Sequence, residues 1–104
     1  PLRAELPTYR AEAVSLLFAR CYAGLSRSAQ ARAEFESAEA RFGTFEVKAQ
    51  YAIWAHAIGD QHTARRLDAE LEKITSRWNA LTRDLNAAVY RRYLAAKEQA
   101  GRRA

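Results

Sequence analysis

Apolar residues recur at a regular spacing in the C-terminal part of the chain. Between Asp60 and Gln99 the sequence contains neither Gly nor Pro. Within this stretch the intervals between large apolar positions alternate between four and three residues, at Leu67, Leu71, Ile74, Trp78, Leu81, Leu85 and Ala88. Such intervals form the heptad pattern of helices that pack along one edge. The pattern predicts one long helix over residues 60–98 with an apolar seam.

Three shorter runs at helical spacing precede this stretch. They predict helices over residues 9–25, 29–42 and 45–58. Their expected apolar faces are centred on Leu17 and Phe18 in the first run and on Phe35 in the second. Alanine, the strongest helix former, is frequent throughout, so local propensity and apolar spacing agree.

Residues that start and stop helices mark the three joints. Ser28 offers an N-cap to the second helix, and Gly43 fits the left-handed residue that ends it. Thr44 opens the third helix and Gly59 ends it. Asp60 is the expected N-cap of the long helix.

The short joints predict the fold class. Connections of two to four residues make neighbouring helices antiparallel, so we expect an all-α array of helical hairpins or a bundle, forming a single domain over residues 1–104. The fourth helix would be about 58 Å long, roughly twice the length of the others. Part of its seam should therefore project beyond them and need a partner.

Composition narrows the class of protein further. Of the 104 residues, 49% are hydrophobic and 28% are charged. This balance is typical of a small globular domain. The lone cysteine, Cys21, excludes an intrachain disulfide and is expected to be a buried small hydrophobe.

Targeting signals are not recognisable in the sequence. No segment is long and apolar enough to span a membrane, and no signal peptide can be identified. The default expectation is a cytoplasmic protein, although a start at Pro1 leaves room for a leader that has been removed.

The joint between the third and fourth helices has a recognisable composition. Small residues flank a Gly-Asp turn, in the order Tyr51, Ala52, Ala55, Gly59, Asp60 and Ala64. This order resembles the helix A to helix B turn of a tetratricopeptide repeat over residues 51–71. The resemblance departs from the family at Asp68 and Leu71, where the repeat has an aromatic and a small residue. It implies protein binding on a helical groove.

The sequence contains no recognisable cluster of catalytic or metal-binding residues. His56 and His62 with Asp60 straddle a helix joint at no recognised metal-ligand spacing. Acidic pairs two residues apart, such as Glu34 with Glu36, point to different sides of a helix. We therefore expect no enzyme, no cofactor and no metal.

The net charge of +5 is concentrated at the C-terminal end. Its basic residues are Arg91, Arg92, Lys97, Arg102 and Arg103. Interleaved with Tyr90 and Tyr93, they could contact phosphates and stack on bases, which makes nucleic-acid binding the alternative function. Cations at a helix C-terminus also complement the helix dipole, which is a sufficient structural reason for them.

The seam itself favours protein association. An antiparallel pair of long helices centred near Ala80 sets Glu70 opposite Arg91 and Arg77 opposite Asp84, whereas a parallel pair forms no ion pair. The predicted function is a non-enzymatic interaction or assembly module, with a second copy or another helical protein as its partner. Its expected contact residues are Leu67, Leu71, Ile74, Trp78, Leu81 and Leu85, with Glu70, Arg77, Asp84 and Arg91 setting the orientation.

Overall fold

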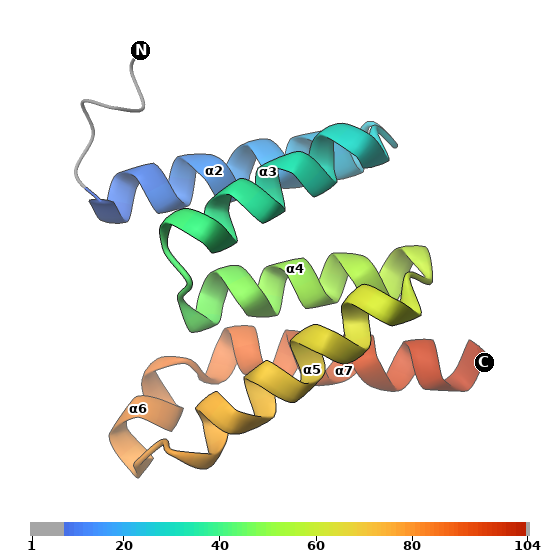
Figure 1. Ribbon diagram of the computed structural model, residues 1–104. Coiled ribbons are helices and arrows are strands. Elements are labelled where there is room, and N and C mark those ends of the chain that lie inside the picture. The colour runs from blue at the N-terminus through green and yellow to red at the C-terminus, as the bar shows by residue number, and fades with distance from the viewer. Residues whose placement is uncertain (1–7, 104) are drawn as a thin grey trace. The chain divides into compact units, whose positions relative to one another are not determined.

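The computed structural model describes residues 8–103, and its regular structure in this range is entirely helical (Figure 1). The helices are α2 (Thr8–Gly24), α3 (Ser28–Arg41), α4 (Phe45–Ile58), α5 (Gln61–Ser76), α6 (Ala80–Leu85) and α7 (Ala87–Arg103). The predicted all-α class is confirmed, and the first three helices match their predicted ranges to within one residue at each end. The single domain over residues 1–104 stays a prediction, and the chain divides into two compact units, one ending at Val47 and the other beginning at Lys48.

The first unit is a hairpin in which α2 and α3 pack against each other. Phe35 is 2% exposed, and the other buried apolar residues of the two helices are Ala11, Leu16, Ala19, Ala31 and Ala38. Most of these residues are small, which lets the two helix backbones approach closely. Cys21 is exposed, so the prediction that it is buried is wrong, because the buried face of α2 runs through Leu16 and Ala19 instead.

The connection between α2 and α3 differs from the sequence prediction. Ser28 is the first residue of α3, and Arg27 occupies the N-cap position. The side chain of Arg27 forms no capping hydrogen bond with this helix. Ser26 takes a left-handed conformation with φ of 58° and reverses the chain. The Arg27 carbonyl then accepts the first backbone hydrogen bond, from the Ala31 N–H at 2.9 Å. Because the backbone reverses at Ser26, α3 already begins at Ser28. Ser28 is therefore inside the helix and is not its N-cap.

The other two joints follow the predicted signals. Gly43 and Gly59 both have positive φ, of 58° and 80°. A side chain would be strained in this conformation. The Thr44 hydroxyl accepts a hydrogen bond from the Val47 N–H at 3.3 Å and so caps α4. Asp60 caps α5 through a carboxylate oxygen that accepts from the Thr63 N–H at 3.2 Å.

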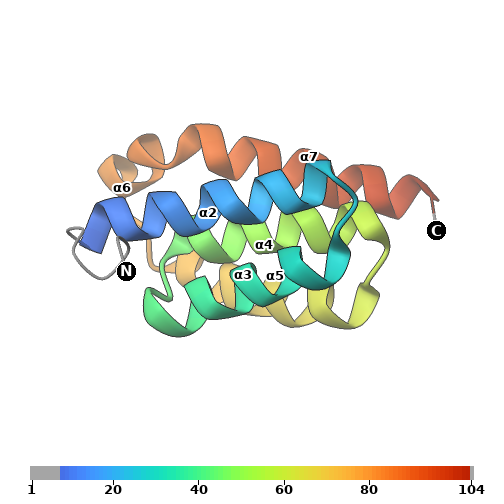
Figure 2. The same cartoon turned by 90° about the horizontal axis from the view of Figure 1, so that it is seen from above.

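The second unit comprises α4, α5 and α7, with α6 at the corner where the chain turns back (Figures 1 and 2). Tyr51 from α4, Leu67 and Leu71 from α5, and Tyr93 from α7 are at most 3% exposed and form its core. Small buried residues on both sides of the Gly59 turn, Ala52, Ala55 and Ala64, bring α4 close to α5. This turn has the composition on which the repeat resemblance rests, and the resemblance stays a prediction.

The predicted single helix over residues 60–98 is wrong. Three helices occupy this range, separated at residues 77–79 and at Asn86. At the end of α5 the hydroxyls of Thr75 and Ser76 donate to backbone carbonyls of the preceding turn, at 3.2 and 2.8 Å. Ser, Thr and Asn are poor helix formers because their side chains compete for backbone groups. The spacing of apolar residues, on which the prediction of one long helix was based, does not reflect this competition of polar side chains for backbone groups.

Asn79 interrupts the helical backbone between α5 and α6. Its backbone is extended, with φ of −88° and ψ of 178°, and its side-chain oxygen accepts from the Thr82 N–H at 2.8 Å. Asn79 therefore acts as the N-cap of a new helix, α6, in place of an interior residue of α5. Because α7 returns along α5, the predicted projecting half of a long helix does not exist.

The Asp60 cap can be tested through stability. Asp60→Ala removes the acceptor of both the Thr63 N–H and the Thr63 hydroxyl, which donates at 2.7 Å. We expect the free energy of unfolding to fall by about 1–2 kcal/mol, the usual cost of losing an N-cap. Urea unfolding followed by circular dichroism measures it. Gln61→Ala, at the exposed neighbouring position, is the control, and an equal loss in both variants would contradict the assignment.

Candidate functional site

The residues of the predicted contact seam divide into three groups by exposure. Leu67 and Leu71 are 0% and 1% exposed and belong to the core of the second unit. Leu81 and Leu85, both on α6, are 67% and 76% exposed. The remaining two, Ile74 and Trp78, are half-buried. The protein's own packing thus covers the seam wholly or in part, except at the two leucines of α6.

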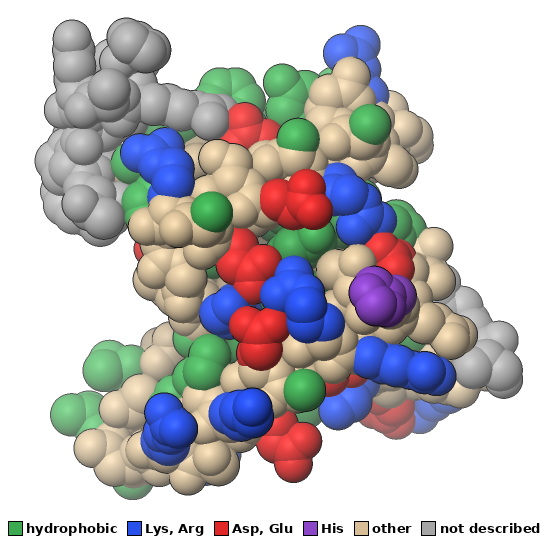
Figure 3. Space-filling view, viewed as in Figure 1, with side chains coloured by type: hydrophobic (Ala, Val, Ile, Leu, Met, Phe, Trp, Pro, Cys, Tyr) green, Lys and Arg blue, Asp and Glu red, His purple; other side chains and the backbone are tan. Residues whose placement is uncertain are grey.

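The α6 corner, which we define as Leu81 and Leu85 with the flanking Arg77 and Asp84, is an exposed apolar surface with mixed charge. Figure 3 shows hydrophobic side chains gathered at the surface over α6, beside basic ones. The two leucines lie four residues apart and so share one side of the helix. Arg77 and Asp84 are exposed, and neither forms an ion pair within the described part of the chain.

A second exposed apolar surface, which we call the α2 surface, lies on α2 and on the residue that follows it, Leu25, in the first unit. Leu17, Phe18 and Leu25 are 60%, 42% and 65% exposed. The sequence predicted an apolar face of the first helix centred on Leu17 and Phe18, and that prediction is wrong, because α3 covers the face that carries Leu16 and Ala19. Among residues 11–24, whose exposure the structure describes, Arg20 is the exposed charged residue, so this part of the α2 surface lacks the mixed charge of the α6 corner.

A polar network that the sequence analysis missed holds the second unit together. Asp68 on α5 accepts a hydrogen bond from the Tyr93 hydroxyl of α7 at 2.5 Å. Its two carboxylate oxygens lie 3.0 and 3.1 Å from Nε2 of His56 on α4. Because an ionised carboxylate only accepts, Nε2 of His56 carries the proton in this pair. One carboxylate therefore joins three helices.

Burial gives this network its strength. The side chains of His56 and Asp68 are 11% and 16% exposed. Desolvation, and then the hydrogen bond to Asp68, raise the pKa of Tyr93 well above its usual value. The rings of Tyr90 and Trp78 extend the contact toward α6, with centroids 5.6 Å apart in an edge-on arrangement. The aromatic side chains of α7 thus serve packing and hold the returning helix in place.

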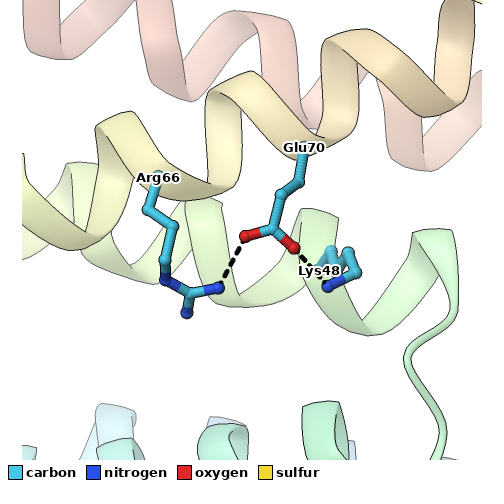
Figure 4. A network of polar contacts seen from close by, with 3 residues as sticks. All are labelled: Lys48, Arg66 and Glu70. Carbon is cyan, nitrogen blue, oxygen red and sulfur yellow. Dashed lines mark hydrogen bonds and ion pairs between the residues drawn. The ribbon is translucent and has the colours of Figure 1, made fainter.

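Glu70, predicted to set the orientation of a partner, is engaged within the second unit. Its carboxylate lies 2.7 Å from Nζ of Lys48 on α4 and 2.7 Å from a guanidinium nitrogen of Arg66 on α5 (Figure 4). The hydrogen bond from Lys48 is the main cause of a lowered pKa of Glu70. Glu70 thus fastens α4 to α5, whereas Arg77, Asp84 and Arg91 remain exposed.

Only some of the C-terminal residues that were predicted to contact nucleic acid are exposed. Arg91, Arg92 and Lys97 are exposed, and Arg102 pairs with Glu98 at 2.7 Å. The side chain of Arg103 lies outside the described residues. Tyr93 is 3% exposed and cannot stack on a base, which removes one aromatic element of the predicted nucleic-acid surface.

Pockets next to the polar network are small. One of about 250 Å³ is lined by His56, Gly59 and Asp60 from the turn, with Ala100 from α7. Another of about 200 Å³ lies between α5 and α7, beside Asp68 and Tyr93. Within the described residues no three His, Cys, Asp or Glu side chains are placed to hold a metal ion. Nor is any helix of the described range long and apolar enough to cross a membrane.

The sequence offered only partial signals for this network. His56 was expected on a partly buried face and is half-buried. Asp68 occupies a helix position next to the core residue Leu67, and it stands 25 residues from its partner Tyr93. Pairing across that separation follows only once the chain turns back at α6.

Comparison with known proteins adds no assignment: no protein-family model, no curated protein and no solved structure matches the chain.

The Tyr93–Asp68 bond predicts a specific pH dependence. In the unfolded chain Tyr93 loses its proton near its usual pKa of about 10. The folded protein retains this proton at that pH. Unfolding then releases a proton, so this contribution to stability is lost as pH rises above about 10. We expect the free energy of unfolding to fall more steeply in the wild type than in Tyr93→Phe, by up to about 1.4 kcal/mol per pH unit.

Guanidinium unfolding at pH steps from about 9 to about 12 measures this difference. Tyr22→Phe, in the first unit, removes a hydroxyl outside the network and is the matched control. Parallel pH profiles for the wild type and Tyr93→Phe would show that the buried bond does not control the titration.

Proposed function

We propose that the protein is a non-enzymatic association module that binds a second copy of itself through the α6 corner. The observation that carries the proposal is the exposure of Leu81 and Leu85 on α6, whereas Leu67 and Leu71 of the same seam are buried and Ile74 and Trp78 are half-buried. Large apolar side chains adjacent on one side of a helix are typical of contact surfaces when they are rimmed by charge.

The charges of the corner favour a second copy over an unrelated helical protein. In a two-fold arrangement a residue i that contacts j is matched by j contacting i. Arg77 and Asp84 have opposite charge, so two α6 corners placed antiparallel can pair each with its counterpart. Such exposed pairs add at most about 1 kcal/mol each and mainly select orientation.

The size of the corner limits the strength of a simple face-to-face contact. Burying four leucines, two from each copy, contributes roughly 6–12 kcal/mol. Association itself costs roughly 4–15 kcal/mol in lost translational and rotational freedom. We therefore expect association in the micromolar range or weaker when the α6 corner is the whole interface.

Light scattering coupled to size exclusion, over a concentration series, tests the proposal. We expect the wild type to shift toward a dimer with increasing concentration, and Leu81→Glu with Leu85→Glu to remain monomeric with unchanged helical content. Leu17→Glu with Leu25→Glu, on the exposed surface of α2, is the matched control. Loss of the dimer in the α2 variant alone, or a monomer at every concentration, would exclude the α6 corner.

Nucleic-acid binding is the alternative that the exposed Arg91 and Arg92 support. It predicts retention of random single or double strands at low salt and a steep loss of binding as salt rises. Arg91→Ala with Arg92→Ala should reduce the salt dependence by about two phosphate contacts. The absence of retention at low salt would discard the alternative.

A further inference from the structure

The apolar stripe of the C-terminal half continues through both helix breaks. Its members are Leu67, Leu71, Ile74, Trp78, Leu81, Leu85, Val89, Tyr93, Ala96 and Ala100, separated by three or four residues throughout. Intervals of three and four in this mixture keep pace with the α-helical repeat of about 3.6 residues per turn. One straight helix would carry all of these residues on a single side, although the chain bends between them.

Exposure along the stripe is greatest at the bend. Leu67 and Leu71 at its start and Tyr93 near its end are at most 3% exposed. Leu81 and Leu85, the two members on α6, are 67% and 76% exposed. The folded-back arrangement therefore covers both ends of the stripe and leaves its centre in solvent. A form in which the bend straightens could cover the centre as well.

The bend depends mainly on Asn79. Its ψ of 178° is far from the helical value, whereas Arg77 (φ −96°, ψ −2°) and Asn86 (φ −107°, ψ 9°) lie nearer to the helical region. Across Asn86 the backbone bonds of a helix persist, from the Asn86 N–H to the Thr82 carbonyl at 3.2 Å and from the Tyr90 N–H to the Asn86 carbonyl at 3.0 Å. A change centred on residues 78 and 79 would thus make residues 61–103 one helix.

The position of α7 on α5 fits an exchange between two copies. In the folded-back form Tyr93 meets Asp68 on α5 (Figure 1 shows α7 crossing behind α5). If two straightened helices lie antiparallel, with Trp78 of one beside Leu81 of the other, Tyr93 of the second copy falls opposite Arg66. Measured along the helix axis, this level is about 3 Å from Asp68, which points to another side of the helix than Arg66 and adjoins the seam residue Leu67. The exchanged α7 would therefore reach the site that the chain's own α7 occupies.

We propose that two copies associate by exchanging the segment 80–103, so that α7 of each copy packs on α4 and α5 of the other. The Asp68–Tyr93 hydrogen bond then forms between copies, and the exposed Leu81 and Leu85 become buried against Ile74 and Trp78 of the second copy. Arg77 lies within one helical turn of Asp84 of the second copy. This inference rests on the proposed self-association and names its structural form.

Exchange also resolves the limited area of the α6 corner. A face-to-face dimer gains only the contacts of the corner, whereas an exchanged dimer replaces the packing of the chain's own α7 with that of the second copy's α7 and adds the contacts of the corner. The ordering of α7 has no additional cost, because α7 is ordered in both forms. Domain swapping is a low-cost route to dimers for this reason.

Ala80→Pro separates the two kinds of dimer. Ala80 is the first residue of α6, and the preceding Asn79 is extended. Pro is well tolerated at the first position of a helix, and the residue before Pro prefers an extended backbone, so the folded-back monomer should form normally. In a straightened helix residue 80 is interior, where Pro breaks the helix. We expect the dimer dissociation constant to rise about a hundredfold or more.

Asn79→Ala acts in the opposite direction. It removes the side chain that accepts from the Thr82 N–H. It also introduces the best helix former at the bend. We expect a larger dimer fraction after unfolding and refolding at high protein concentration, measured by light scattering. Asn79→Asp keeps the capping oxygen and is the matched control, with a dimer fraction like that of the wild type.

Cross-linking identifies which chain α7 packs on. Ala57 on α4 and Ala95 on α7 are both exposed and line the same pocket. In a Cys21→Ser background, Ala57→Cys with Ala95→Cys is treated with a short bifunctional maleimide after the dimer fraction is isolated. Exchange joins two chains covalently on a denaturing gel. Face-to-face docking links the two cysteines within each chain and leaves single chains.

The outcomes distinguish the inference from the proposed function. A dimer that persists in Ala80→Pro, gives single chains after cross-linking and is lost in Leu81→Glu with Leu85→Glu overturns the exchange and leaves the proposed association intact. A wild type that stays monomeric before and after refolding overturns both. Covalent dimers in the wild type, absent in Ala80→Pro, support exchange.

Discussion

The second unit depends on how the Asp68 carboxylate is satisfied. The side chain of Asp68 is only 16% exposed. A carboxylate this buried has lost most of its hydration, and hydrogen bonds must compensate the loss. His56 from α4 and Tyr93 from α7 supply them, so the same charge that is costly to bury fixes three helices relative to one another. Removing either donor would leave the charge less satisfied, which makes α7 more than a passive cover for the apolar core.

This requirement explains why the chain turns back after α5. Leu71 lines one pocket together with Tyr93 and Leu94 of α7, and the same helix brings Tyr93 to Asp68. The turn also determines which apolar residues stay outside. At the corner, α6 lies beyond the three packed helices, and its two leucines remain in solvent. The proposed contact surface is therefore a consequence of the same fold-back that completes the core.

Several local features were predictable because they depend on residues close in sequence. Asp60 caps α5 through Thr63, three residues away, and Gly43 and Gly59 take the positive φ that the ends of α3 and α4 require. The breaks in the predicted helix over residues 60–98 were not predictable from heptad spacing. This spacing shows which side chains can be buried together, but it does not show where polar side chains compete for backbone hydrogen bonds. Asn79 is compatible with a helix interior and with an N-cap, and the packing of α7 decides between the two.

The sequence alone determined the all-α class, the bounds of the first three helices and the existence of an apolar stripe in the C-terminal half, because helical periodicity and capping act over a few residues. Only the tertiary structure decided where that stripe is covered. The burial of Leu67 and Leu71, the exposure of Leu81 and Leu85, and the pairing of Asp68 with Tyr93 all follow from contacts between segments far apart along the chain. Such contacts depend on the direction in which the chain leaves the turn at residues 77–79, where the backbone of Asn79 is extended.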